Sequence, residues 1–282
     1  MLLASPSRPE TYFELLGRSL NLYWHALGRT ILLSLLLSIV VFSPRLICLA
    51  VGQNVFLTMS FHDFYQLLYI FTFYFCVLWF LAAAFWRVYC VAQNKKETYI
   101  SDLKQALKKI LYIVGAAIII FFVLALAAVV ALNLHALLRH YQLLNQHNIP
   151  ASFLTAVILF VQALVPLYMT FIFYFYFPLI VIENDKIFTA LKQSVILVWG
   201  NMWRTLSLQV TPWVVYLLVI MLLRNFLKLD LHVYFFAINK TPSFFATALN
   251  LVLLSFFIVW SISVVLVQLW DLELRKKYSG NQ

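Results

Sequence analysis

One 18-residue pattern occurs twice in this chain, 175 positions apart, and this repeat constrains the fold more than any other feature. Residues 13–30 read FELLGRSLNLYWHALGRT, and residues 188–205 read FTALKQSVILVWGNMWRT. A weaker third copy lies midway, where residues 103–105 match residues 191–193. We therefore predict three quasi-repeats of roughly 88 residues, at about 10–97, 98–185 and 186–275. The identical pairs of the two clear copies are Phe13/Phe188, Leu16/Leu191, Ser19/Ser194, Leu22/Leu197, Trp24/Trp199, Arg29/Arg204 and Thr30/Thr205.

The composition places the chain in a membrane. Hydrophobic residues make up 64% of it and charged residues only 11%, whereas soluble domains are about half apolar and a quarter charged. We expect an all-α polytopic bundle that forms one integral membrane domain over residues 1–282. Many of the aromatic side chains stand near the ends of apolar runs, as in the aromatic belts of membrane proteins.

Six apolar stretches are long enough to cross the hydrocarbon core as helices, which takes about 20 residues. Each predicted repeat would contribute an amphipathic helix followed by two spans. The first span should end or kink at Pro44. The fourth is long and holds Pro166 and Pro178, so we expect a kink, a tilt or an emerging last turn there. The predicted spans are residues 30–50, 66–90, 110–134, 152–182, 206–226 and 244–270.

The positive charges predict the orientation. Fifteen of the 20 lysines and arginines fall on one side of the six predicted spans. Positive residues mark the cytoplasmic side, so both termini should be cytoplasmic. Because these charges flank membrane segments, anionic lipid headgroups are the expected partners rather than nucleic acid.

Basic amphipathic helices precede a span in each predicted repeat, as expected for helices in the plane of the cytoplasmic interface. They could form a collar that binds lipid headgroups or closes over a central cavity. Alternatively, they simply pack on the ends of the bundle as connectors. The residues expected at headgroups or at the interface are Arg18, Trp24, Arg29, Lys104, Lys108, Lys192, Trp199 and Arg204.

Small residues predict which spans lie inside the bundle. Residues 82–84 are all alanine, and small residues recur from Gly115 to Ala131. Small side chains let helices approach closely, so the second and third spans should be internal.

No constellation for catalysis, cofactor binding or metal binding stands out. The middle of every predicted span lacks ionisable residues, which argues against proton-coupled transport. No nucleotide loop, nucleophile elbow or metalloprotease motif occurs. We therefore expect no catalytic residue, no cofactor and no metal site. The histidines of the predicted outer side are expected to be solvated loop residues; they are His62, His135, His140, His147 and His232.

Residues 178–205, PLIVIENDKIFTALKQSVILVWGNMWRT, and the C-terminal WDLELRKKYSG resemble segments of a broad family of bacterial inner-membrane proteins. This family comprises the YciC-like proteins and the membrane domain fused to some glycerophosphodiester phosphodiesterases. Glu273 stands where the family usually has an arginine, and Arg275 follows two positions later. The positions that carry the resemblance include Pro178, Glu183, Ser194, Gly200, Asn201, Asp271 and Arg275.

The resemblance implies a six-span bundle with interfacial helices in a bacterial inner membrane. The resemblance does not imply phosphodiesterase activity, because the soluble phosphodiesterase domain is not part of this sequence. Our leading hypothesis is a non-enzymatic membrane protein that binds lipid or a membrane-protein partner. The alternatives are a channel or transporter of lipids or small molecules around the repeat axis, and a membrane enzyme that acts on lipids through Glu183, Asp185 or the outer histidines.

Overall fold

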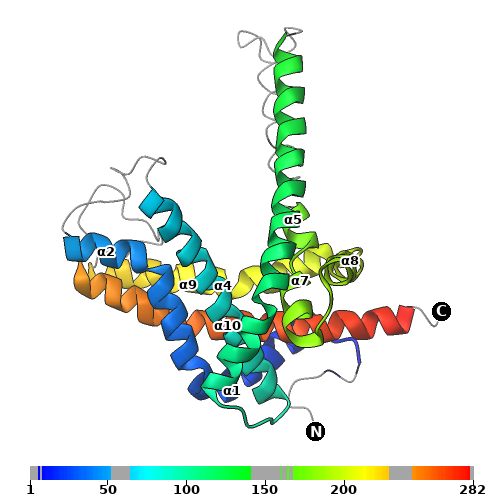
Figure 1. Cartoon of the computed structure of the whole chain (residues 1–282). Coiled ribbons are helices and arrows are strands. Elements are labelled where there is room, and N and C mark those ends of the chain that lie inside the picture. Colours follow the sequence, from blue (N-terminus) through cyan, green and yellow to red (C-terminus); the bar gives the residue numbers. More distant parts are fainter. Residues whose placement is uncertain are drawn as a thin grey trace.

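The computed structural model of the protein describes residues 6, 8–51, 64–140, 160, 164, 168–228 and 243–279. The regular elements within these ranges are all helices, as the sequence predicts. In chain order they are α1 (Tyr12–Val41), α2 (Ser43–Val51), α4 (Phe64–Ala92), α5 (Tyr99–His140), α7 (Tyr176–Pro178), the π-helix η1 (Leu179–Glu183), α8 (Ile187–Val198), α9 (Met202–Leu227) and α10 (Phe244–Ser279) (Figure 1).

Five of these helices, α1, α4, α5, α9 and α10, are long and apolar enough to cross a membrane. The chain is therefore an integral membrane protein of the helical class. Nearly half of the predicted fourth span, 152–182, lies outside the described residues. The C-terminal part of this predicted span, which the structure describes, belongs to a short apolar helical segment, Tyr168–Glu183. Six spans in three repeats therefore stay a prediction.

The first two amphipathic segments are not separate helices, in contrast to what we expected. In the first unit, amphipathic segment and span form one 30-residue helix, α1. Thr11 and Glu14 form a capping box at its start, and no strong helix breaker follows before Val41. The helix ends there and α2 begins at Ser43, which confirms the interruption predicted at Pro44. In the second unit, α5 likewise continues from the amphipathic segment into the span.

In the third unit, by contrast, the amphipathic segment and the span are two helices, α8 and α9. Gly200 separates them with a φ of +84°, a left-handed conformation that glycine adopts without steric cost. Asn201 precedes α9 as its N-cap residue. The first copy has His25 and Ala26 at these two positions, and its helix continues.

Helix α10 forms the centre of the structure and α5 its periphery (Figure 1). In the most apolar 18-residue stretch of each helix, 61% of the α10 residues but only 11% of the α5 residues are buried. Helices α1, α4, α8 and α9 all pack against α10. The fully buried residues of α1 include small side chains at every fourth position, which allow close helix approach in membranes. These are Ala26, Thr30, Ser34 and Ser38.

The prediction that the second and third spans are internal holds for the small residues of α4 but not for either helix as a whole, since only 22% of the α4 residues and 11% of the α5 residues are buried in their most apolar stretches. Ala82, Ala83 and Ala84 of α4 are fully buried. On α5, close packing is limited to the N-terminal half, where a side chain at Gly115 would meet Ile187 of α8. Farther along α5, large apolar side chains are exposed within the described residues, as suits contact with lipid. They include Ile118, Phe121, Phe122, Leu126 and Val130.

Candidate functional site

A buried ionic cluster joins the two ends of the chain, and we call it the Asp271 cluster. It consists of Glu10, Arg18, Arg204, Asp271 and Arg275. Asp271 Oδ2 lies 3.1 Å from a terminal nitrogen of Arg204 and accepts a 2.8 Å hydrogen bond from Arg275 Nε. Its Oδ1 accepts a 2.9 Å hydrogen bond from the backbone N–H of Glu10. The carboxyl group of Asp271 is fully buried, so these partners replace its hydration.

Glu10 contributes both its backbone and its side chain to this cluster. Its carbonyl oxygen accepts hydrogen bonds from Arg204 and, at 2.7 Å, from Arg275. Its carboxylate forms an ion pair with Arg18, whose Nε lies 3.0 Å from Oε2. The cluster thus joins three arginines to two carboxylates.

A cleft of about 490 Å³ opens beside this cluster, and we call it the Trp199 cleft. Arg275 belongs to both the cluster and the cleft, and Lys276 supplies a second cation. Trp199 is 67% exposed, as expected of an indole at the level of lipid headgroups. The cleft is lined by Pro9, Ile196, Leu197, Trp199, Asn201, Leu272, Arg275, Lys276 and Tyr278. It therefore combines an apolar floor with cations and amphipathic rings.

The structure brings together only part of the residues predicted at the interface. Arg18 and Arg204 belong to the Asp271 cluster, and Trp199 lines the cleft that bears its name. The other predicted residues are exposed and belong to neither. These are Trp24, Arg29, Lys104, Lys108 and Lys192.

The positions that carry the family resemblance shape this end of the bundle. Pro178 follows a turn at residues 173–175 and directly precedes the π-helix η1. Buried Ser194 holds that turn: its hydroxyl donates to the carbonyl of Ile172 at 2.8 Å and accepts from the N–H of Phe175 at 3.0 Å. Gly200 and Asn201 separate α8 from α9. Ser194 therefore has a structural partner on another segment.

Glu183 ends the π-helix and lies beside Glu273 of α10. Burial, a hydrogen bond with Glu273 and the charge of Glu273 together raise the pKa of Glu183 from 4.5 to about 8. The side chain is nevertheless on the molecular surface. Glu273 occupies the position where the resembling family usually has an arginine.

Two ionic features escaped the sequence analysis. Glu10 was not singled out, because nothing local shows that it meets Asp271. Arg87 and Asp102 form a second buried ion pair, at 2.5 Å from Nε to Oδ2. Arg87 also lies over the ring of Tyr99 and donates to the carbonyl of Glu97 at 2.6 Å. A charged residue at the end of an apolar helix indicates a buried ion pair, but the sequence alone does not show which residue is the partner.

No group of His, Cys, Asp or Glu that could hold a metal ion occurs among the residues that the structure describes. The side chains of the five outer histidines lie outside that description. Comparisons of the chain with models of protein families, with curated proteins and with solved structures found no match.

Proposed function

We propose that this chain is a non-enzymatic membrane protein that binds an anionic phospholipid on the cytoplasmic side, with the headgroup in the Trp199 cleft. The observation that carries the proposal is the combination of Arg275 and Lys276 with Trp199 in one cleft. The cations attract a phosphate, the indole suits the polar edge of the bilayer, and the apolar floor accommodates glycerol and the first methylenes.

The same contacts support the proposed topology. Glu10, at the N-terminal end, contacts Asp271 and Arg275 near the C-terminal end. Two chain ends that meet at the ends of membrane-crossing helices lie on one side of the membrane, which requires an even number of spans. Together with the distribution of Lys and Arg, this supports six spans with both termini in the cytoplasm. A bacterial inner membrane follows from the family resemblance.

Matched burial supports the proposed repeat. Phe13 and Phe188 are 79% and 76% exposed, while Trp24 and Trp199 are 68% and 67% exposed. Ser19 and Ser194 are both buried, as are the pairs Leu22/Leu197 and Thr30/Thr205. Superposition of an experimental structure of residues 10–97 and 186–275 would test the repeat, and units whose two spans fail to superpose would contradict it.

Lipid titration followed by native mass spectrometry tests the headgroup site. Purified full-length protein is titrated with phosphatidylglycerol and, separately, with zwitterionic phosphatidylcholine. We expect tighter binding of phosphatidylglycerol. Lys276→Ala should weaken it about fivefold, because one charge near an anionic headgroup contributes about 1 kcal/mol. Trp199→Ala should also weaken binding, through the loss of the cleft wall.

Two matched variants distinguish a site from general surface attraction. Lys277 is the next residue and carries the same charge, but it does not line the cleft. Trp24 matches Trp199 in exposure and in repeat position. If Lys277→Ala weakens binding as much as Lys276→Ala, or Trp24→Ala as much as Trp199→Ala, the cleft is not the site. Equal affinities for the two lipids would also overturn the proposal.

A further inference from the structure

We propose that a second, apolar cavity binds one acyl chain of a phospholipid from the cytoplasmic leaflet. This cavity, the Phe85 cavity, has a volume of about 420 Å³ and lies between α4, α5, α10 and the segment 168–178. Its walls include Leu81 and Phe85 of α4, Ala117 and Leu124 of α5, Tyr174 of the broken segment and Val265 of α10. The volume is within the usual range of small-molecule sites, roughly 300–1,000 Å³.

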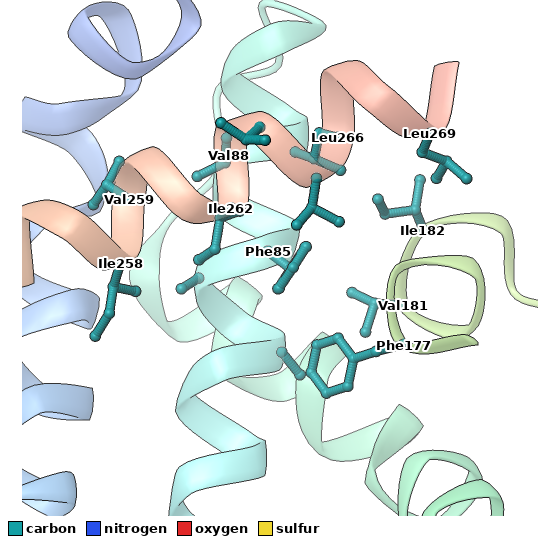
Figure 2. Close-up of a cluster of buried hydrophobic side chains, with 14 of the residues drawn as sticks. Phe85, Val88, Phe177, Val181, Ile182, Ile258, Val259, Ile262, Leu266 and Leu269 are labelled. Carbon is teal, nitrogen blue, oxygen red and sulfur yellow. The ribbon is translucent and has the colours of Figure 1, made fainter. Parts of the chain in front are cut away.

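The cavity results from the break in the segment that precedes α8. The turn at residues 173–175 interrupts the helix before Pro178, and Ser194 bonds the backbone atoms that the turn leaves unpaired. Phe177 then packs against Phe85 with ring centroids 5.2 Å apart. This aromatic pair forms a wall beside the buried cluster along α10 (Figure 2). The local geometry that Ser194 maintains therefore also shapes the cavity.

The depth of the cavity fits the cytoplasmic half of the bilayer. Phe85, Pro178 and Val265 stand four or five residues before the predicted cytoplasmic ends of their spans. Ala117 stands seven residues after the start of its own span. At a rise of 1.5 Å per residue, these residues lie within about 11 Å of the predicted cytoplasmic ends of their spans, whereas the half-thickness of the hydrocarbon core is about 15 Å. At that depth in the proposed topology, the surrounding molecules are the acyl chains of the cytoplasmic leaflet.

The lining identifies a phospholipid chain rather than a free fatty acid. No charged residue is among those that line the cavity. A free fatty acid would need a partner for its carboxylate, since an unpaired charge is costly in an apolar environment. A phospholipid chain brings no charge, because its phosphate stays at the interface.

The Phe85 cavity is distinct from the Trp199 cleft. The two sites share no lining residue. In the buried cluster, Ile182 of η1 faces Leu269 of α10 (Figure 2). The acyl-chain proposal rests on the proposed topology, but it does not require a headgroup in the cleft. Failure of one site therefore leaves the other testable.

Photolabelling in nanodiscs tests the cavity directly. Full-length protein is reconstituted in phosphatidylcholine that contains an analogue with a photoreactive diazirine in the middle of one acyl chain. We expect labelling within residues 168–178 and on the cavity side of α5. Ala117→Trp, which fills the cavity, should lose the labelling of residues 168–178. Ala128→Trp adds the same side chain at an exposed position of the same helix and should keep it.

Leu124→Trp provides a second filled cavity in case Ala117→Trp does not fold, and it should show the same loss. Labelling of residues 168–178 that persists in a folded filled-cavity variant would overturn the proposal. A photoreactive free fatty acid that labels these residues when the phospholipid does not would also overturn it. So would crosslinks between two copies of the chain through the cavity residues.

Discussion

The two clear copies of the repeated segment place identical residues in unlike surroundings. Arg29 of the first copy is exposed, whereas Arg204 of the third binds Asp271 and Glu10. Ser19 donates to the carbonyl of Leu16 in its own helix, whereas Ser194 bonds two backbone atoms of the segment before it. Five of the seven identical pairs share their burial, which follows from the local pattern, but the copies differ in partners.

The difference shows that the two copies have different roles in the structure. In the first copy, which is part of one long helix, Ser19 bonds within the helix and Arg29 faces outward, although Arg18 pairs with Glu10. The third copy is divided at Gly200, and its Ser194 and Arg204 connect distant segments. Both proposed lipid sites depend on the third copy: Trp199 lines the cleft, and Ser194 maintains the break beside the cavity. Matched substitutions in the two copies can therefore separate general from specific roles.

The largest expected difference is between Arg204→Ala and Arg29→Ala. Removing Arg204 leaves the buried carboxylate of Asp271 with one cationic partner fewer. We expect a loss of roughly 3 kcal/mol in the free energy of unfolding, since breaking a buried ion pair is strongly destabilising. Arg29→Ala should change it by less than about 0.5 kcal/mol. Equilibrium unfolding in mixed micelles measures both, and equal losses would contradict the assignment of the cluster.

Ser194→Ala and Ser19→Ala should differ less. Ser194→Ala leaves the N–H of Phe175 and the carbonyl of Ile172 without their partner. Hydrogen bonds between membrane helices contribute from under 1 to about 2 kcal/mol, so we expect a loss of about 1–2 kcal/mol. Ser19→Ala, which removes only a bond within one helix turn, should cost less than about 0.5 kcal/mol. Hydrogen exchange at Phe175 should accelerate in Ser194→Ala alone. Unchanged exchange there would show that the hydroxyl does not hold the turn.

Two glycine substitutions should have opposite signs. Gly200 has a positive φ and open space around it, so Gly200→Ala should cost about 1 kcal/mol through backbone strain alone. Gly28 stands inside α1, also with open space, and Gly28→Ala should stabilise by about 0.5–1 kcal/mol because alanine favours helix. Melting temperatures in detergent would reveal the signs. A stabilising Gly200→Ala would mean that α8 and α9 are not divided there.

The smallest expected effect is a pH dependence at Glu183. Its pKa is about 8 in the folded protein against 4.5 as the ordinary value. The folded state therefore holds a proton that the unfolded chain releases, and stability should fall as pH rises from about 4.5 to 8. Glu183→Gln should flatten this slope in melting curves. Because Glu183 lies on the molecular surface, the pH dependence of stability that it causes should be small. If the slope of stability against pH is the same in Glu183→Gln, Glu183 is not the source of that slope.

The sequence by itself determined the class of protein and one of the places where its helices break. Apolar runs of sufficient length fix a helical membrane protein, because backbone groups in hydrocarbon must bond within their own segment. Pro44 predicted an interruption that the structure contains, and the structure also has a turn just before Pro178, in the span where a kink, a tilt or an emerging last turn was expected. These are consequences of residues that act on their own neighbours along the chain.

Only the tertiary structure decided which matched residues acquire a role. Glu10 and Asp271 are 261 positions apart, and no local pattern pairs them. The division of the third copy at Gly200 and the continuity of the first were also missed, because the repeat led us to expect the same architecture in each unit. Charge pairing and cavities depend on which segments meet in space. A repeated sequence specifies the face that is buried, but the neighbours that pack against that face specify what its polar residues do.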